Sequence, residues 1–446
     1  MNDSAPPGTT AGRPATAPPA LDEKTASKVA IGALVGNALE WYDFFLFTTA
    51  AALVFNVQYF VSDDAVTSAL ASFATLAVGF IARPLGGLLF GRMGDRVGRR
   101  TTLLVTIVLI GVTTGLIGLL PNFFTIGLAA PVLLTLLRVV QGLALGGEWS
   151  GAIIIAVEHA PPAKRGRFAA LPQIGSPIGT LMSSGAFVLV SLLSQDTFDS
   201  WGWRLPFLAA IPLLLVGLFI RTQLEESPEF TRLLENNEVA HAPISTVLRE
   251  SWRQVLAGAA VAFLGMGGFY LVTTFVISYG TRILELDSTL LLIGTLSAAT
   301  VEIGVIVVAG RLTEAFGASR VVVVGGLATA LAAFPVFWLI ETANPLLVVL
   351  GMTLGVAGLS FPYGACGTAL AGLFRPQLRY SGVAIASNGA AMLSGCVPLI
   401  ATAVFAASGD QIWTAAALFV TIALITVAGG LLTPRLSIAE AGVTRR

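Results

Sequence analysis

Twelve apolar runs dominate this sequence, and each approaches or exceeds the roughly 20 residues that a helix needs to cross a bilayer. Lipid offers no hydrogen bonds to a peptide backbone, so runs of this length fold as helices. Hydrophobic residues make up 55% of the 446 residues, charged residues make up 11%, and the mean hydropathy is +0.84. This composition excludes two or three soluble domains and predicts an all-α polytopic membrane protein. The runs cover approximately 28–60, 66–90, 101–120, 126–157, 168–193, 203–220, 255–279, 288–309, 321–340, 346–374, 383–407 and 412–432.

The basic residues are distributed unevenly between the two sides of these runs. Of 25 Lys and Arg residues, Arg83 and Arg138 lie inside runs, and Arg204 and Arg282 lie in one set of connections. The other 21 fall in the termini and in the opposite set of connections. The positive-inside rule therefore predicts a multi-pass protein of the plasma (cytoplasmic) membrane with both termini cytosolic. The formal net charge is zero, which gives no indication of a nucleic-acid partner.

The chain divides into two sets of six runs. Residues 1–27 are rich in Pro, Ala, Thr and Gly and are expected to form a disordered cytosolic tail. We expect an N-terminal six-helix bundle at 28–220, a cytosolic linker at 221–253 and a C-terminal six-helix bundle at 254–433. A second cytosolic tail is expected at 434–446.

The connections after the second and eighth runs repeat one another. The first begins at Gly91 and the second at Gly310, an offset of 219 residues, and both contain Gly-Arg, an acid and a second Gly. Two halves in the same orientation are typical of parallel-repeat transporters, whose site lies near the midplane between the halves. We expect each connection to form a tight turn that holds one conformation, with weaker bracing in the second copy. The residues given this gating or structural role are Arg83, Gly91, Asp95, Arg96, Gly98, Arg99, Arg100, Gly310 and Glu314.

Polar side chains share one face of the first run. Asn37, Glu40 and Asp43 are spaced by three residues, which places them within about a third of the helix circumference. Ionised groups in a membrane helix normally line a water-filled cavity or a binding site. The alternative is that the two carboxylates reach toward a membrane surface.

The fourth run carries a second polar face. Arg138, Gln141 and Glu148 lie within roughly 80° of one another on a helical wheel. Gly142, Gly146 and Gly147 permit a close approach of a neighbouring helix. A buried arginine requires an acid, although the sequence leaves the pairing open and a purely structural ion-pair network remains the alternative. The acids available inside the runs are Glu40, Asp43, Glu148 and Glu302.

The second half offers aromatic and amide side chains rather than charge. Its candidate pocket residues are Tyr270, Tyr363 and Asn388, and its single acid inside a run is Glu302. The predicted substrate-binding set is therefore Asn37, Arg138, Gln141, Tyr270, Tyr363 and Asn388.

A transported proton needs a carboxylate or a tyrosine, because His159 and His241 both lie in polar connections. The first-half runs contain three acids against two arginines, which leaves one acid without a partner. We favour Glu40 or Asp43, which lie one turn apart and repel each other, over Glu148, with Glu302 in reserve.

No cofactor or metal site is predicted. Cys366 and Cys396 lie in separate apolar runs and show neither metal-ligand spacing nor a disulfide framework. No histidine lies in a membrane run to complete a catalytic Ser/His/Asp arrangement, so the chain is not expected to be an enzyme.

Several longer motifs resemble those of the major facilitator superfamily and, within it, the metabolite:proton symporter family. The resemblance extends from about Lys28 to Leu432 and implies twelve transmembrane helices in two six-helix halves. Similar members import shikimate, 2-oxoglutarate, citrate, proline or betaine with protons. Departures are Arg92 where the family often has His, Ser150 where Gly is common, and Cys396 where a second Gly is usual. The motifs are Gly36-Asn37 with Glu40-Trp41-Tyr42-Asp43-Phe44, Gly79-Phe80-Ile81-Ala82-Arg83-Pro84-Leu85-Gly86-Gly87, the 91–100 connection, Arg138-Val139-Val140-Gln141-Gly142, Gly146-Gly147-Glu148-Trp149, Gly202-Trp203-Arg204-Leu205-Pro206-Phe207, Glu226-Ser227-Pro228 and Arg379-Tyr380-Ser381-Gly382.

The expected function is import of a small organic acid or related metabolite, coupled to a proton, by alternating access. The expected partners are a carboxylate or zwitterion, a proton and the lipid bilayer, without nucleic acid, and the functional unit is expected to be a monomer. The alternative is proton-driven efflux, because Gly175-Ser176-Pro177-Ile178-Gly179 loosely resembles a glycine motif of superfamily antiporters.

Overall fold

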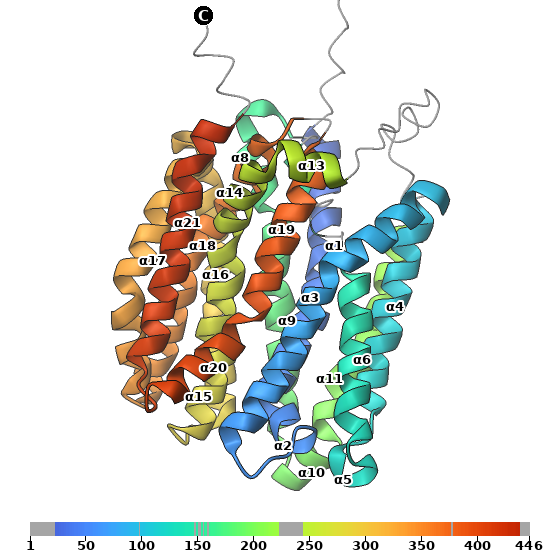
Figure 1. Ribbon diagram of the computed structural model, residues 1–446, viewed down its shortest axis with the longest axis vertical. Helices are drawn as coiled ribbons and strands as arrows, with labels where there is room; N and C mark the ends of the chain where they lie inside the picture. Colours follow the sequence, from blue (N-terminus) through green and yellow to red (C-terminus); the bar gives the residue numbers. More distant parts are fainter. Residues whose placement is uncertain are drawn as a thin grey trace, which may run out of the picture.

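The computed structural model describes residues 23–97, 99–146, 149, 153–154, 156–157, 160–222, 244–375 and 378–437. Nine helical stretches in this part are long and apolar enough to cross a membrane, and three shorter apolar helices fill the remaining places in chain order. The prediction of twelve membrane helices is confirmed. The first helix of the bundle begins, and the last one ends, on the same face (Figure 1).

The first six crossings are assembled from the following elements. They are α1 (Glu23–Ala50) with η1 (Ala51–Phe55) and α2 (Asn56–Gln58), α3 (Ala65–Val97), α4 (Arg99–Leu119), α6 (Ala129–Ala144), α8 (Arg165–Ala170) with η3 (Pro172–Ile174) and α9 (Gly175–Ser191), and η4 (Gly202–Arg204) with α11 (Leu205–Thr222). Short helices α5 (Phe123–Ile126), η2 (Pro162–Lys164) and α10 (Gln195–Ser200) lie in the connections.

The second six crossings follow α13 (Ile244–Glu250). They are α14 (Trp252–Phe263) with η5 (Leu264–Gly268), η6 (Leu271–Phe275) and α15 (Val276–Arg282), α16 (Ser288–Phe316), α17 (Ala318–Glu341), α18 (Pro345–Leu373), α19 (Arg379–Gly395) with α20 (Val397–Ala407), and α21 (Trp413–Leu436). The segments η1, η5 and η6 are π-helical, a geometry that usually appears as single-turn bulges in α-helices.

The two halves meet along two helix pairs. In one pair α3 lies against α19 and α20, and in the other α9 lies against α16. In Figure 1, α17 and α21 lie on one side of this interface, while α4, α6 and α11 lie on the other. Among the nine long stretches, Ala30–Gln58 and Trp252–Arg282, which contain α1 and α14–α15, have the largest buried share.

Glycines bring α3 and α6 into backbone contact. A Cβ atom at Gly86 would overlap the backbone of Leu143, and one at Gly142 would overlap the carbonyl of Gly79. The close packing expected at Gly142 is therefore confirmed, and Gly147 lies outside the described residues. This contact sets the separation of α3 and α6. These two helices carry Arg83 and Arg138.

The two repeated connections are shorter than the sequence suggested. α3 continues as helix to Val97 and α4 begins at Arg99, so most of the 91–100 connection, which was expected to be a turn, is helical; residue 98 lies outside the described part. In the second copy α16 continues to Phe316, and the turn is made at Gly317, whose φ of 87° suits a residue without a Cβ. Arginine-rich segments between apolar runs suggest cytosolic loops, but arginine is also a good helix former.

The opposite, extracellular face contains a well-capped helix start. Asp64 accepts hydrogen bonds from the hydroxyl of Thr67 (2.6 Å) and from the backbone N–H groups of Thr67 and Val66 at the start of α3. These bonds, led by the Thr67 hydroxyl and joined by the charge of Arg282, hold the pKa of Asp64 below its usual value. The carboxylate therefore caps α3 in its ionised form at neutral pH.

The topology can be tested with single cysteines in a variant without Cys366 and Cys396. Asp63→Cys and Gln411→Cys sit at exposed positions on the extracellular face, so a membrane-impermeant thiol reagent should label both in intact cells. Arg320→Cys, exposed on the opposite face, should be labelled only after permeabilisation. Labelling of Arg320→Cys from outside, with protection of the other two, would contradict the orientation.

Candidate functional site

Asp43 is the centre of a buried hydrogen-bond network in the first half. Its carboxylate is contributed by α1 and is 2% exposed. It accepts hydrogen bonds from the Thr114 hydroxyl of α4 and from Gln141 Nε2 of α6, the latter at 3.2 and 3.3 Å. Gln141 Oε1 in turn accepts a hydrogen bond from Arg138 Nη1 at 3.2 Å. Gln141 thus stands between the acid and the arginine, and both direct donors to Asp43 are neutral groups.

Arg138 is fully buried, and only some of its N–H groups have hydrogen-bond acceptors in the described part of the chain. Its guanidinium lies over the rings of Phe44 and Phe47, with 4.6 and 4.3 Å from Cζ to the ring centroids. Its Nε and Nη2 atoms have no hydrogen-bond acceptor within the described part of the chain. Buried donors normally have partners, so these two N–H groups are suited to a group supplied from outside.

Glu40 and Arg83 form the ion pair that the sequence left open. Arg83 Nη2 lies 2.7 Å from Glu40 Oε1, and the two side chains are 6% and 4% exposed. The pair connects α1 to α3, and the Arg83 guanidinium also lies 5.4 Å from the Phe44 ring centroid. Arg83 therefore pairs with an acid of the first half and is not the partner of Glu302.

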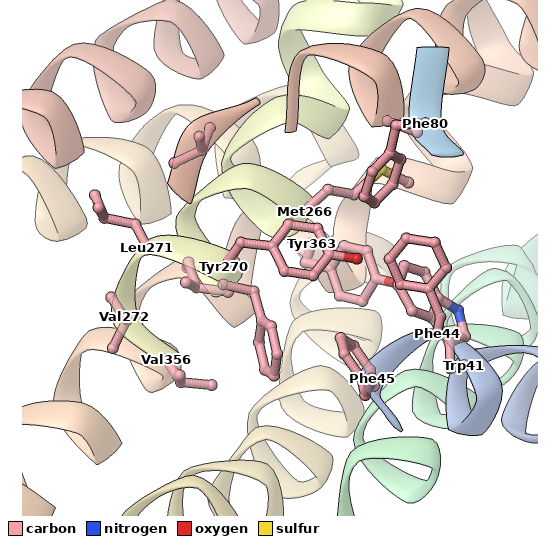
Figure 2. Close-up of a cluster of buried hydrophobic side chains, with 14 of the residues drawn as sticks. Trp41, Phe44, Phe45, Phe80, Met266, Tyr270, Leu271, Val272, Val356 and Tyr363 are labelled. Carbon is pink, nitrogen blue, oxygen red and sulfur yellow. The ribbon is translucent and has the colours of Figure 1, made fainter. Parts of the chain in front are cut away.

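Aromatic rings close the space between the halves. Phe45 of α1 lies 4.9 Å from Phe269, and Phe44 lies 5.9 Å from Tyr270, measured between ring centroids. Figure 2 shows Tyr270 and Tyr363 pointing from the second half toward Trp41, Phe44 and Phe45. The side chains that line the recess between the halves leave no room in it for a water molecule. The recess is lined by Trp41, Phe45, Ser176, Gly265, Met266, Phe269, Tyr270 and Tyr363.

The remaining predicted site residues lie apart from this network. Asn37 donates from Nδ2 to the carbonyl of Pro172 at 2.5 Å, which ties α1 to η3 inside the first half. Asn388 is half-buried on α19. Glu302 is buried on α16, within electrostatic reach of Tyr363. Glu148 lies outside the described residues.

Polar contacts join the halves on both sides of the recess. On the cytosolic side, Arg167 of α8 donates from its backbone N (3.0 Å) and its Nε (2.9 Å) to the carboxylate of Glu314 on α16. On the extracellular side, the Ser191 and Thr289 hydroxyls lie 3.1 Å apart. The second-copy acid, expected to brace only weakly, thus contacts the opposite half. Of the first-copy motif, residue 98 and the side chains of Asp95, Arg96, Arg99 and Arg100 lie outside the description.

A third polar contact lies between the recess and the cytosolic ion pair. Gln173 of η3 accepts a hydrogen bond from Trp149 Nε1 and donates to the carbonyl of Tyr363 at 3.2 Å and to Cys366 Sγ at 3.0 Å. Sequence reasoning missed Thr114, Arg167 and Gln173. Thr114 and Gln173 could have been noticed as polar residues in apolar runs, whereas Arg167 looks like any other cytosolic arginine.

These features describe a helical membrane protein with a closed recess between two bundles, an arrangement that is typical of parallel-repeat transporters. Residues 29–254 match the model of the family described as Sugar (and other) transporter. The chain is 38% identical over 382 residues to the inner membrane metabolite transport protein YhjE of Escherichia coli K12, covering 84% of this chain and 87% of that protein. It is 36% identical over 394 residues to the shikimate transporter of the same organism, covering 86% and 89%.

A third relative is the proline/betaine transporter of Salmonella typhimurium, which is 33% identical over 424 residues, covering 91% of this chain and 83% of that protein. The crystal structure of a D-xylose-proton symporter has a TM-score of 0.70 at 18% identity and covers 93% of this chain and 99% of that one. The chain therefore belongs to the major facilitator superfamily, in its family of sugar and other transporters, and is a multi-pass metabolite transporter.

Gly79 offers a test of how far transport depends on the position of Arg138. A Cβ atom at Gly79 would lie 2.5 to 2.9 Å from Nε, Cγ and Cδ of Arg138, so Gly79→Ala should push the guanidinium out of place. Loss of one charge-assisted contact, worth about 1.5–3 kcal/mol, should reduce substrate affinity by about tenfold or more. Radiolabelled uptake in proteoliposomes measures this.

Gly304→Ala is the matched control, because a Cβ atom there meets nothing within 4 Å. It should transport normally. A Gly79→Ala protein that is folded and takes up substrate with an unchanged KM would show that Arg138 can move without consequence.

Proposed function

We propose that this protein imports a small organic acid together with a proton, by alternating access between the two helical halves. The observation that carries the proposal is the buried Arg138 guanidinium, whose Nε and Nη2 lack acceptors among the described residues beside the closed recess. Relatives named for shikimate and for proline/betaine support a carboxylate-bearing substrate.

The hydrogen-bond inventory near the recess favours a ligand rich in acceptors. Besides Arg138, Trp41 Nε1 and Tyr270 Oη are buried without a hydrogen-bond partner in the described part of the chain. Each of these three side chains can donate, and unpaired buried donors are costly. A carboxylate offers two oxygens that accept several N–H and O–H donors, and the planar guanidinium suits it in a bidentate geometry.

We propose that the carboxylate of Asp43 binds the coupling proton. Glu40 is neutralised by Arg83, whereas Asp43 is held by Thr114 and Gln141, which donate hydrogen bonds without supplying a charge. Protonation of Asp43 would remove its negative charge and turn one of its two acceptor oxygens into a donor, which would weaken its hold on Gln141 and loosen the link to Arg138. The arginine could then engage a substrate carboxylate, so the loaded carrier would move one anion and one proton with no added net charge.

The gates proposed for this cycle are the polar contacts at the two ends of the interface. Separation of Ser191 from Thr289 would open the outer side, and separation of Arg167 from Glu314 would open the cytosolic side. The proposed gating role of the connection at Gly91 to Arg100 adds to the cytosolic contact. Proton-driven efflux remains the alternative, and Gly175 and Gly179 of its glycine motif pack directly against Ala38 and Trp41 of α1.

Arg138→Lys tests the anion site. Lysine keeps the charge but loses the planar fork, so it cannot hold Gln141 and a carboxylate at the same time. We expect the KM of the transported carboxylate to rise by about tenfold to a hundredfold, the value of one charge-assisted hydrogen bond. An uptake panel that includes shikimate, proline and betaine measures it.

Arg204→Lys is the control for that substitution. Arg204 is also buried in the first half, but it donates to the carbonyls of Gly118 and Leu120 at 3.1 and 2.6 Å, away from the recess. This variant should keep the wild-type KM even where stability falls. An unchanged KM in Arg138→Lys would leave Arg138 with a structural role only.

Asp43→Asn tests the proton site. An amide cannot titrate, so uphill accumulation driven by a pH gradient should be abolished, while exchange of substrate already on both sides should continue. The measurement compares gradient-driven uptake with counterflow in the same proteoliposomes. Asp196→Asn, at an exposed position outside the membrane helices, should behave as wild type. Accumulation by Asp43→Asn against a substrate gradient would show that the proton is carried elsewhere.

A further inference from the structure

Glu302 is a buried acid for which the described residues supply no ion-pair partner. It is 1% exposed on α16, and its Oε2 atom has no hydrogen-bond donor in the part of the chain that the structure describes. The described residues also include no arginine, lysine or histidine in an ion pair with it, in contrast to Glu40. An isolated ionised carboxylate is so unfavourable in a low-dielectric interior that such groups bind a proton instead.

The position of Glu302 places it between the two halves. The helices α9 and α16 run antiparallel, and three contacts follow one register. These contacts join Ser191 to Thr289, Gly185 to Leu296 and Ala170 to Gly310. That register sets Glu302 opposite residues 177–179, near the first turn of α9. Glu302 is also within electrostatic reach of Tyr363, which lines the recess between the halves together with Ser176 of α9.

Among the described elements that pack against α16, the charged groups are few and lie toward the helix ends. On α18 the titratable groups are Tyr363, which is within electrostatic reach, and Cys366. Helix α9 and segment η3 contain no titratable side chain. The charged groups of the other neighbours lie at helix ends, and Arg167 is engaged by Glu314. They are Arg165 and Arg167 of α8, Arg282 of α15, and Arg320 and Glu341 of α17, with Tyr279 of α15 as the further titratable group.

Comparison of the two repeats indicates why Glu302 lacks a charged partner from the seventh crossing. Arg83 occupies the corresponding place in the first half and is paired with Glu40 of α1. The helix equivalent to α1 in the second half has no charged residue between Arg253 and Arg282. The second half therefore contains the acid, Glu302, but its seventh crossing has no charged residue between Arg253 and Arg282 that could stabilise the ionised form.

We propose that Glu302 is a second proton-binding site, separate from Asp43, that carries a proton while α9 and α16 are in contact and releases it to water when they part. The carboxyl O–H bond breaks in the opened, hydrated interface, and the proton passes to a water molecule. The ionised carboxylate then opposes closure until it is protonated again. This rests on the proposed function only in that alternating access separates the two helices.

Counterflow at equal pH on both sides tests the proposal, because it needs closure of the halves but no proton gradient. Wild-type counterflow should slow at alkaline pH, with a slope approaching tenfold per pH unit for a single proton. Glu302→Gln, which cannot ionise, should lose that slope, while Glu302→Asp should keep it. Glu341→Gln, an acid of the same half at an exposed position, is the matched control and should follow wild type.

The Asp43→Asn protein separates this proposal from the proposed function. It should keep the alkaline slope, even though it cannot accumulate substrate. Accumulation by Asp43→Asn would overturn the choice of coupling acid and leave the Glu302 measurement intact. A slope that is unchanged in Glu302→Gln would overturn the present proposal, as would a slope that follows sodium concentration rather than pH.

Infrared spectroscopy of the purified protein reads the proton directly. At neutral pH, the spectrum should contain a neutral carboxylic acid band that is absent from Glu302→Gln and shifted in Glu302→Asp. The two variants together keep the test valid where one of them does not fold. An undiminished band in Glu302→Gln would show that Glu302 is ionised in the closed protein and would overturn the proposal.

Discussion

The cost of placing charge in a membrane interior governs how the first half of this protein is built. Removing an ion from water costs several kcal/mol even after relaxation, so each buried charge must find compensation. Arg83 is compensated by an ion pair with Glu40. Asp43 is compensated by hydrogen bonds from two neutral donors, one of which also accepts a hydrogen bond from Arg138. These contacts join α1, α3, α4 and α6, so the polar network that we propose for transport also holds the first bundle together.

The contacts between the halves are of a different kind, and their weakness suits a protein that must open. Arg167 is 49% exposed where it meets Glu314, and an ion pair at such a site contributes about 1 kcal/mol or less. The outer contact is a single pair of hydroxyl groups, Ser191 and Thr289. The first half thus contains a buried ion pair, Arg83 with Glu40, whereas the ion pair between the halves is partly exposed, which suits bundles that move relative to each other as rigid bodies.

The membrane helices could be read from the sequence because apolar run length is a direct measure of what can cross a bilayer. The partners of the buried charges could not, since they depend on helix rotation and on contacts such as that between Gly86 and Leu143, which no single run encodes. For the same reason the face shared by Asn37, Glu40 and Asp43 was correctly grouped, yet its members have three different partners. The sequence overestimates the length of the turns near Gly91 and Gly310. In the second copy the helix direction changes at a single residue, Gly317.

The two halves repeat in outline but differ in what they bring to the site. The first half supplies the charges, whereas the second half supplies aromatic rings and the solitary acid Glu302. Tyr270, which faces Phe44 and Phe80, lies between the π-helical segments η5 and η6 of the seventh crossing. A π-helical turn departs from the regular hydrogen-bond pattern of the α-helix, and such turns are frequent at functional sites. The charge network would thus stay fixed on a rigid bundle, while the ring that covers it sits on a helix that can change its local winding. In the transport cycle that we propose, the first half would recognise the anion and the second half would control access to it.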